Sequence, residues 1–352
     1  MGVEQARERL RGTDLPEHGT AKARYSEGTR AGHGFVRKAL KISGVVQGVG
    51  FRPFLYREAA RLRLGGFARN TSYGVYTEIE GDEPSCAAFL DALDHGAPLL
   101  SRVTNVYAEE IPPRGETHFV ILPSEAGTRS ALISPDLALC ADCRRELFDP
   151  ADRRYRYPFL NCTNCGPRFT IVQDVPYDRA NTSMASFVQC PNCQREYENP
   201  LDRRFHAQPN ACPACGPKLK LFVGGEEWEG DPVEGFKALI RAEKIVAVKG
   251  LGGYHLACDA TSERAAALLR ERKRRYEKPF AVMARDLAAA KRLCEVDSEE
   301  AALLTGTQKP IVLLKKRPDY ALAPSVAPGN ARLGIMLPYT PLHELLLEEF
   351  EA

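Results

Sequence analysis

Eight of the eleven cysteines are spaced as metal ligands. They form four pairs in which two residues separate the cysteines, and 18 residues lie between the first and second pairs and again between the third and fourth. The pairs are Cys140/Cys143, Cys162/Cys165, Cys190/Cys193 and Cys212/Cys215. Four thiolates complete a tetrahedral site and fill the coordination sphere of zinc. The spacing therefore predicts two structural Zn²⁺ ions, in modules at 140–165 and 190–215, although an interleaved pairing stays open.

Disulfide bonds and iron–sulfur clusters are the other common uses of such cysteines. Disulfides belong to oxidising compartments, and the start of the chain has no apolar segment typical of a secretory signal, so we expect a cytoplasmic protein. Ferredoxin spacings differ from those found here. The cysteine region also repeats itself 50 residues later, as Cys165-Gly166-Pro167 and Cys215-Gly216-Pro217 illustrate, which indicates an internal duplication.

A glycine-rich segment is the second candidate for chemistry. It consists of Gln47, Gly48, Val49, Gly50 and Phe51, and Arg52 follows it. Glycines let backbone N–H groups converge on an anion, and a planar guanidinium can hold two phosphate oxygens. Taken alone, Arg52 is more typical of a solvated surface arginine, and Asn70 is more typical of a turn residue.

Periodicity places both residues on a ferredoxin-like βαββαβ unit. Helical spacing covers 53–62 and 84–93, and strand patterns cover 39–46, 67–70, 75–80, 103–111 and 118–122. The glycine-rich segment would join the first strand to the first helix, and Asn70 would end the second strand. The presence of both motifs on one βαββαβ unit favours a functional role for the two residues.

The whole chain is predicted to be an α+β multidomain protein. We expect a disordered leader at 1–37, the βαββαβ domain at 38–125, the tandem cysteine modules at 126–222 and a further α/β domain at 228–352. The 352 residues carry a net charge of +2, which gives no sign of a nucleic-acid-binding field. No apolar run is long enough for a transmembrane helix, so no membrane is expected as a partner.

Two segments resemble known families. The glycine-rich segment with Arg52, together with the string ARNTSYG at 68–74, resembles acylphosphatases. That resemblance implies that Arg52 binds the phosphate of an acyl phosphate and that Asn70 orients the attacking water. The string KRRYEKPFAVM at 273–283 resembles YrdC-like domains, which bind ATP and form acyl-adenylates. It implies that Lys273, Arg275 and Lys278 bind the nucleotide or carbamate, whereas alone they would be typical of a cationic helix end.

The order of these units is similar to that of the HypF family, the carbamoyltransferases of [NiFe]-hydrogenase maturation. The resemblance implies that carbamoyl phosphate is hydrolysed to carbamate. It further implies that ATP, accompanied by Mg²⁺, converts carbamate to carbamoyl-adenylate, and that a HypE-like protein accepts the carbamoyl group on its C-terminal cysteine. Members of the family continue into a further transfer domain. We therefore expect a truncated chain with an incomplete YrdC-like domain and weak ATP binding. The acylphosphatase and zinc units are each expected to close their own structure.

The roles of two histidines are undecided, and two functions other than carbamoyl transfer are also compatible with the sequence. His206 is interpreted as an active-site group facing the next domain, a residue supporting the thiolates or a loop histidine, and His255 adjoins a second glycine run. An RNA-binding or tRNA-modification protein with zinc ribbons would lose affinity steeply with salt. A non-catalytic zinc-dependent interaction scaffold would be unaffected by Arg52→Ala. Carbamoyl phosphate hydrolysis, abolished by that substitution, distinguishes the enzyme from both.

Overall fold

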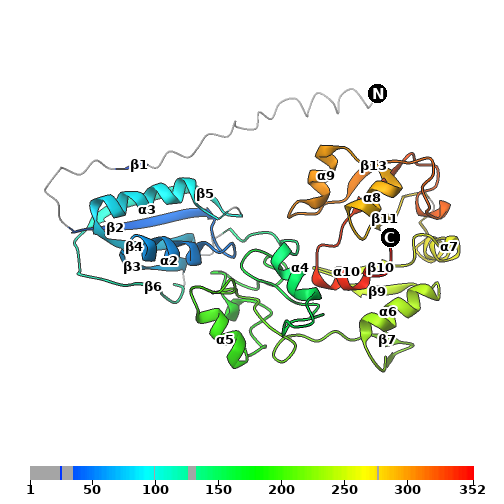
Figure 1. Ribbon diagram of the computed structural model, residues 1–352, viewed down its shortest axis with the longest axis horizontal. Helices are drawn as coiled ribbons and strands as arrows, with labels where there is room; N and C mark the ends of the chain where they lie inside the picture. Colours follow the sequence, from blue (N-terminus) through cyan, green and yellow to red (C-terminus); the bar gives the residue numbers. More distant parts are fainter. Residues whose placement is uncertain (1–23, 26–34, 99, 126–131, 276) are drawn as a thin grey trace.

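The computed structural model describes residues 24–25, 35–98, 100–125, 132–275 and 277–352. Three parts follow one another along the longest axis of the molecule (Figure 1), and they correspond to the blue-to-cyan, green and yellow-to-red stretches of the chain. The cysteine modules lie in the middle, between the N-terminal sheet and the C-terminal α/β part. Among the described residues no helix combines the length and apolarity required to cross a membrane.

The N-terminal part is a mixed sheet covered by two helices that share one core. Its elements are β1 (Arg24–Tyr25), β2 (Phe35–Val45), α2 (Phe51–Arg61), β3 (Gly65–Thr71), β4 (Gly74–Asp82), α3 (Glu83–His95), β5 (Arg102–Ile111) and β6 (Phe119–Ile121). The strand order is β1-β5-β2-β4-β3-β6, and its four central strands have the order of the ferredoxin-like plan. The predicted βαββαβ unit is therefore present.

The expected leader at 1–37 overlaps the first long strand. β2 begins at Phe35, because Arg37 is fully buried and is needed to neutralise Glu78 and Glu80 on the adjacent strand β4. An arginine among charged residues looks solvated in the sequence, but a buried guanidinium is stable when it is paired with carboxylates. β1 also lies within the expected leader and pairs with β5. Residues 1–23 and 26–34 of the leader lie outside the described residues.

The middle part consists of two similar modules. Each begins with a short helix, α4 (Ala141–Phe148) or α5 (Pro191–Glu198), whose N-cap is the first cysteine of that module. A segment that includes the 3₁₀ helix η1 (Arg179–Asn181) joins the modules. The first module shares a core with the C-terminal part, in which Leu147 and Tyr157 pack with Phe236 and Leu345. The modules therefore link the two outer parts.

The C-terminal part is built around a four-stranded sheet with the order β11 (Ala281–Met283), β14 (Arg332–Met336), β13 (Val312–Lys316) and β12 (Cys294–Glu295). Leu314, Leu333 and Ile335 from this sheet are fully buried. A hairpin of β7 (Phe222–Val223) and β8 (Glu226–Glu227) precedes this part. Its elements are α6 (Pro232–Arg241), β9 (Val246–Lys249), β10 (Tyr254–Ala257), α7 (Glu263–Arg272), β11 (Ala281–Met283), α8 (Leu287–Leu293), β12 (Cys294–Glu295), α9 (Ser298–Thr305), β13 (Val312–Lys316), η2 (Pro324–Val326), β14 (Arg332–Met336) and α10 (Pro341–Leu346).

Candidate functional site

A pocket lies where the glycine-rich segment meets the cysteine modules. Gly50 caps the N-terminus of α2 in the left-handed conformation, with φ of 75°, and Gly48 has φ of 73°. Helix N-termini attract anions because their backbone N–H groups are unpaired. A Cβ on Gly48 would lie 3.0 Å from the Arg168 side chain and 3.2 Å from the Tyr177 ring, so glycine is needed there for close approach as well as for backbone conformation.

The predicted residues Arg52 and Asn70 line this same pocket. The Arg52 side chain is largely buried, and its guanidinium lies 3.1 Å from the Asp178 carboxylate. Asn70 is 1% exposed; its Nδ2 donates to the Tyr177 carbonyl at 3.4 Å, while its Oδ1 is buried without a hydrogen-bond partner. A buried carbonyl oxygen without a partner is costly unless a ligand or water satisfies it. The pocket thus offers a cation and an unpaired acceptor.

The other residues of the glycine-rich segment shape the pocket. Val49 and Phe51 are buried in the core of the N-terminal sheet, so their backbone can face the pocket while their side chains anchor the segment. Gln47 uses its side chain as a brace: Nε2 donates to the carbonyls of Thr71 and Gly74 at 2.8 Å, and Oε1 accepts from the Tyr177 N–H at 2.9 Å. The Gln47 amide therefore holds the loop in place.

The cysteine modules supply the rest of the pocket wall. Thr163, Arg168, Tyr177, Ala207 and Gln208 line it together with His206. Arg168 is fully buried; it donates to the Gly48 carbonyl and to carbonyls of the first module, including that of Cys162 at 2.9 Å. His206 lines the pocket together with Arg52 and Asn70 of the N-terminal domain. Of the three interpretations given to His206, this position agrees with a group that faces a neighbouring domain. Burial, reinforced by the charge of Arg52, lowers the pKa of His206 to about 3.

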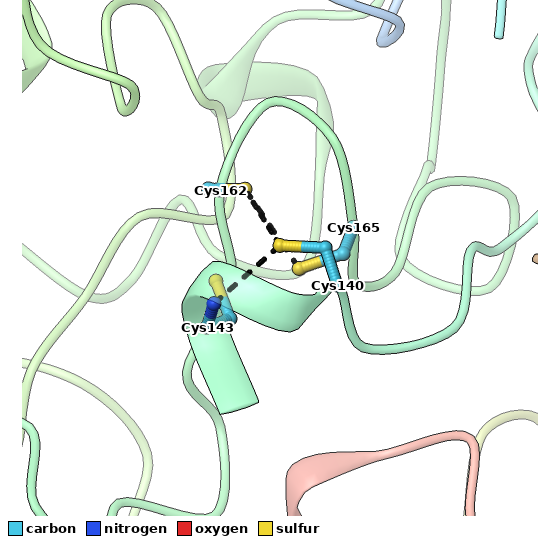
Figure 2. Close-up of side chains that lie close together, drawn as sticks. All are labelled: Cys140, Cys143, Cys162 and Cys165. Atoms are coloured by element: carbon cyan, nitrogen blue, oxygen red, sulfur yellow. Dashed lines mark hydrogen bonds between the residues drawn. The ribbon is translucent and has the colours of Figure 1, made fainter. Parts of the chain in front are cut away.

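The eight paired cysteines form two clusters, and each cluster contains the cysteines of one module. Figure 2 shows the first cluster, formed by Cys140, Cys143, Cys162 and Cys165. In the first, the Cys140 and Cys162 sulfurs are 3.8 Å apart, as are those of Cys162 and Cys165. In the second, the corresponding separations are 3.7 and 3.8 Å. A tetrahedron with Zn–S bonds of ~2.3 Å has edges of about 3.8 Å. The donors therefore fit one tetrahedral ion per cluster and are too far apart for disulfide bonds.

Arginines cross between the two modules. Arg153 and Arg154 of the first module donate to the Cys193 sulfur, at 3.4 and 3.6 Å, and pair with Glu196. Arg203 of the second module donates to the Cys143 sulfur at 3.1 Å. Burial opposes ionisation of Glu196, but the two arginines outweigh it and lower its pKa to about 2. Each cluster is thus neutralised in part by cations of the other module.

The third group of predicted residues lies apart from this pocket. Lys273 caps the C-terminus of α7 and is exposed, as is Lys278. The Arg275 guanidinium donates to the carbonyls of Lys278 and Pro279, at 3.0 and 2.7 Å. His255 lies elsewhere in the C-terminal part, where its Nε2 is 3.0 Å from the Tyr339 hydroxyl. Lys273, Arg275 and Lys278 lie close together in sequence after α7. The guanidinium of Arg275 is already hydrogen-bonded to backbone carbonyls, whereas the two lysines are exposed.

Three family models match successive parts of the chain. Residues 38–121 match acylphosphatase, residues 139–172 and 190–222 match the HypF finger, and residues 238–352 match the Sua5–YciO–YrdC family, described as telomere recombination. The combination of these three matches, supported by the relatives below, decides the family. The chain belongs to the HypF family. The α+β fold class with an acylphosphatase domain, two four-cysteine modules and a YrdC-like domain is confirmed.

Similarity to HypF proteins extends over most of the chain. It is 52% identical over 322 residues to carbamoyltransferase HypF2 of Cupriavidus necator, covering 89% of this chain and 40% of that protein. A crystal structure of full-length HypF in a phosphate- and nucleotide-bound form superposes with a TM-score of 0.87 at 47% identity, covering 91% of this chain and 42% of that one. The acylphosphatase of Moorella thermoacetica is 43% identical over 90 residues, covering 25% of this chain and 96% of that protein. The chain thus spans about 40% of the length of the HypF relatives.

Tyr177 and Arg168 line the pocket and Asp178 pairs with Arg52, but none of the three was identified from the sequence. They lie between the two cysteine modules, where the internal repeat carries no further cysteine or glycine signal. One sequence difference does mark Arg168: it follows Cys165-Gly166-Pro167, whereas Lys218 follows the repeated string in the second module. This difference between the two repeats was the feature of the sequence that could have identified Arg168.

Proposed function

We propose that this HypF-family chain hydrolyses carbamoyl phosphate to phosphate and carbamate. The observation that carries the proposal is that Arg52, Asn70 and the N-terminal end of α2 line one pocket. Carbamate is a carboxylate-like leaving group, so catalysis requires charge neutralisation and positioning more than a strong general base. Similarity to a free-standing acylphosphatase over the same domain supports this choice over an RNA-binding protein or a scaffold.

Each residue of the pocket has a proposed role. The phosphoryl oxygens bind to the guanidinium of Arg52 and to the backbone N–H groups at the start of α2. The unpaired Oδ1 of Asn70 accepts a hydrogen bond from a water molecule and directs its oxygen at phosphorus. The new P–O bond to water forms as the P–O bond to carbamate breaks, and the water proton passes to the products. Asp178, which pairs with Arg52 in this structure, gives way to the phosphoryl group.

We infer that each four-cysteine cluster holds one Zn²⁺ with a structural role. Support comes from the sulfur separations and from the match to the HypF finger family. Four thiolates leave no open coordination position, so the ion stabilises the module and does not contact substrate. The thiolates must stay reduced, which favours the cytoplasm as the location of the protein.

The later steps follow from the family and remain proposals for this chain. Carbamate would react with ATP and Mg²⁺ in the YrdC-like domain to give carbamoyl-adenylate, with Lys273, Arg275 and Lys278 as candidate ligands for phosphate or carboxylate groups. A HypE-like protein would accept the carbamoyl group. Lys273 and Lys278 are exposed and therefore accessible to an anionic ligand.

The decisive experiment is release of phosphate from carbamoyl phosphate by wild type and Arg52→Ala. Loss of a group that neutralises developing charge costs ~10²–10³ in rate, so we expect a decrease of at least about a hundredfold. Arg61→Ala is the matched control, since Arg61 lies on the same helix with an exposed side chain. Equal rates for wild type and Arg52→Ala, or equal losses in both variants, would contradict the proposal.

A further inference from the structure

The cysteine modules form one wall of the pocket, and the proposed hydrolysis assigns no function to that wall. An acyl phosphate has two ends, and Arg52 with the start of α2 accounts for the phosphoryl end. The acyl end must then lie against residues from the cysteine modules. Among these residues His206 stands out, because its Nδ1 is buried and has no hydrogen-bond partner. The acylphosphatase of Moorella thermoacetica is matched over 96% of its own length by 90 residues of this chain, so its length leaves no room for cysteine modules of this kind.

His206 is held in place by its backbone and its neighbours. Its φ is 53°, a left-handed conformation that is uncommon for a residue with a Cβ, and its N–H donates to the Tyr197 carbonyl at 3.0 Å. Its ring packs against Tyr197 and Phe205, with centroids 4.9 and 4.6 Å apart. Phe205 in turn packs against Tyr56 of α2 at 5.6 Å. The imidazole is therefore fixed relative to the helix that carries Arg52.

The internal repeat shows that this turn presents a side chain to a neighbouring domain. Arg156 occupies the same place in the first module, with φ of 54° and an N–H bond to the Leu147 carbonyl at 2.9 Å. Its guanidinium pairs with Glu234 and Glu348 of the C-terminal part. In the second module the corresponding side chain is a histidine that faces a pocket, where it has found no protein partner for Nδ1. A purely structural docking residue would be paired, as Arg156 is.

The chemistry of a neutral imidazole suits one kind of acyl group. Burial and the charge of Arg52 keep the pKa of His206 low, so the ring is neutral at neutral pH and carries one donor and one acceptor nitrogen. A carbamoyl group offers both an N–H donor and a carbonyl acceptor. An acetyl group offers only the carbonyl and a methyl group. A site built to bind a substrate N–H rejects an analogue that lacks it, because a buried polar group is then left unpaired.

We infer that His206, supplied by the second cysteine module, hydrogen-bonds the carbamoyl end of the substrate and makes the acylphosphatase pocket selective for carbamoyl phosphate over other acyl phosphates. The inference rests on the proposed hydrolysis and adds its substrate specificity. It gives His206 direct contact with substrate and leaves the phosphoryl chemistry to Arg52 and Asn70.

The test compares phosphate release from carbamoyl phosphate and from acetyl phosphate by the full chain. His206→Phe keeps the packing against Tyr197 and Phe205 but removes both ring nitrogens. We expect its kcat/KM for carbamoyl phosphate to fall at least about tenfold, mainly through KM, while that for acetyl phosphate changes less than about threefold. His206→Gln, which retains an acceptor and donors, should recover part of the selectivity. Arg156→Ala, at the equivalent turn of the other module, should leave the ratio unchanged.

The outcomes separate this inference from the function on which it rests. Equal losses of kcat/KM on both substrates in His206→Phe would mean that the ring only supports the fold, and the inference would be wrong. The inference would also be wrong if His206→Phe changed neither activity, or if wild type did not prefer carbamoyl phosphate to acetyl phosphate. Both of these results would leave acyl phosphate hydrolysis intact. If wild type and Arg52→Ala release phosphate equally from both substrates, the proposed function itself fails. Zinc content and thermal unfolding of each variant identify misfolded protein, and His206→Gln then decides the test.

Discussion

In the described part of the chain, three arginines have less than 2% of their surface exposed, and each has different partners. Arg37 pairs with Glu78 and Glu80, Arg154 binds Glu196 and backbone or amide oxygens, and Arg168 is surrounded mainly by carbonyls. Removing one partner of a buried ion pair leaves a charge uncompensated and costs about 3–5 kcal/mol. These residues therefore fix the positions of strands and loops that have little apolar surface of their own.

The Arg37–Glu80 pair predicts a pH-dependent contribution to stability. Burial raises the pKa of Glu80, but hydrogen bonds from the Arg114 N–H, from Arg37 and from the Gly115 N–H outweigh burial and lower it overall. A carboxyl group with a lowered pKa stabilises the fold above its unfolded pKa, and this contribution is lost as the pH falls through the folded value. Glu80→Gln should therefore reduce the free energy of unfolding by about 2–3 kcal/mol at pH 7, and the difference from wild type should shrink below about pH 4.5.

Urea unfolding of the full chain at several pH values measures this difference. Glu83→Gln is the control, because Glu83 forms an exposed pair with Lys38 and should change stability by less than about 1 kcal/mol. A gap between wild type and Glu80→Gln that stays constant into acid would show that the carboxylate charge is not the source of the stabilisation.

At the scale of elements, the two cysteine modules are interlocked by their crossed arginines. Arg154 lies on the first module but donates to the sulfur of Cys193 and to the Ala211 carbonyl in the second. Arg204 makes the reciprocal contacts with Glu146 and the Asn161 carbonyl. Cations close to thiolates stabilise their charged form and so favour metal binding. The stability of each cluster should therefore depend on residues of the other module.

This arrangement predicts metal loss at a distance in sequence. In Arg154→Ala all eight cysteine ligands are retained, but a cation beside the second cluster is lost. We expect about one of the two Zn²⁺ equivalents to transfer to a chromogenic chelator roughly 10-fold faster or more than in wild type. Arg145→Ala, whose side chain is exposed on α4, should release both ions as wild type does. Adding Arg154→Ala to Cys190→Ser, which already lacks the second site, should produce no further fast release. Fast release in that double variant would place the effect in the first module and contradict the crossed arrangement.

At the scale of the molecule, the acylphosphatase pocket depends on the cysteine modules. The sequence led us to expect that the acylphosphatase and zinc units each close their own structure, but Arg168 bonds the Gly48 carbonyl and Tyr177 bonds Gln47 across the boundary. Arg168 is itself held by the carbonyls of Cys162 and Cys165. The glycine-rich segment is therefore connected through one side chain to the first cysteine cluster.

Arg168→Ala should consequently weaken phosphate binding without removing any residue that contacts phosphate. We expect the inhibition constant of inorganic phosphate against carbamoyl phosphate hydrolysis to rise about tenfold, because a loop misplaced by a fraction of an ångström loses its alignment. Arg195→Ala, on the outer face of α5, should leave that constant unchanged. An unaltered inhibition constant in Arg168→Ala would show that the loop is held by the acylphosphatase domain alone.

The sequence by itself determined the units of this protein. The cysteine spacing, the internal repeat and the glycine-rich string are local patterns, and the turns and ligand sets that they encode form within a few tens of residues. The order of strands and helices in the N-terminal domain follows from periodicity for the same reason. The start of β2 was placed too late, because a buried arginine has the appearance of a surface residue until its partners are known.

Only the tertiary structure decided how these units combine. Asp178 lies 126 residues from Arg52 in the chain, and Tyr177 lies 107 from Asn70, so no local pattern relates them. The crossed arginines and the position of His206 likewise depend on how the modules pack against each other and against the sheet. Side chains that meet across domain boundaries are selected by shape and charge in three dimensions. Their sequence separation carries no signal. For that reason the sequence indicated the part of the pocket that contains Arg52 and Asn70, whereas the part built by the cysteine modules emerged only from the fold.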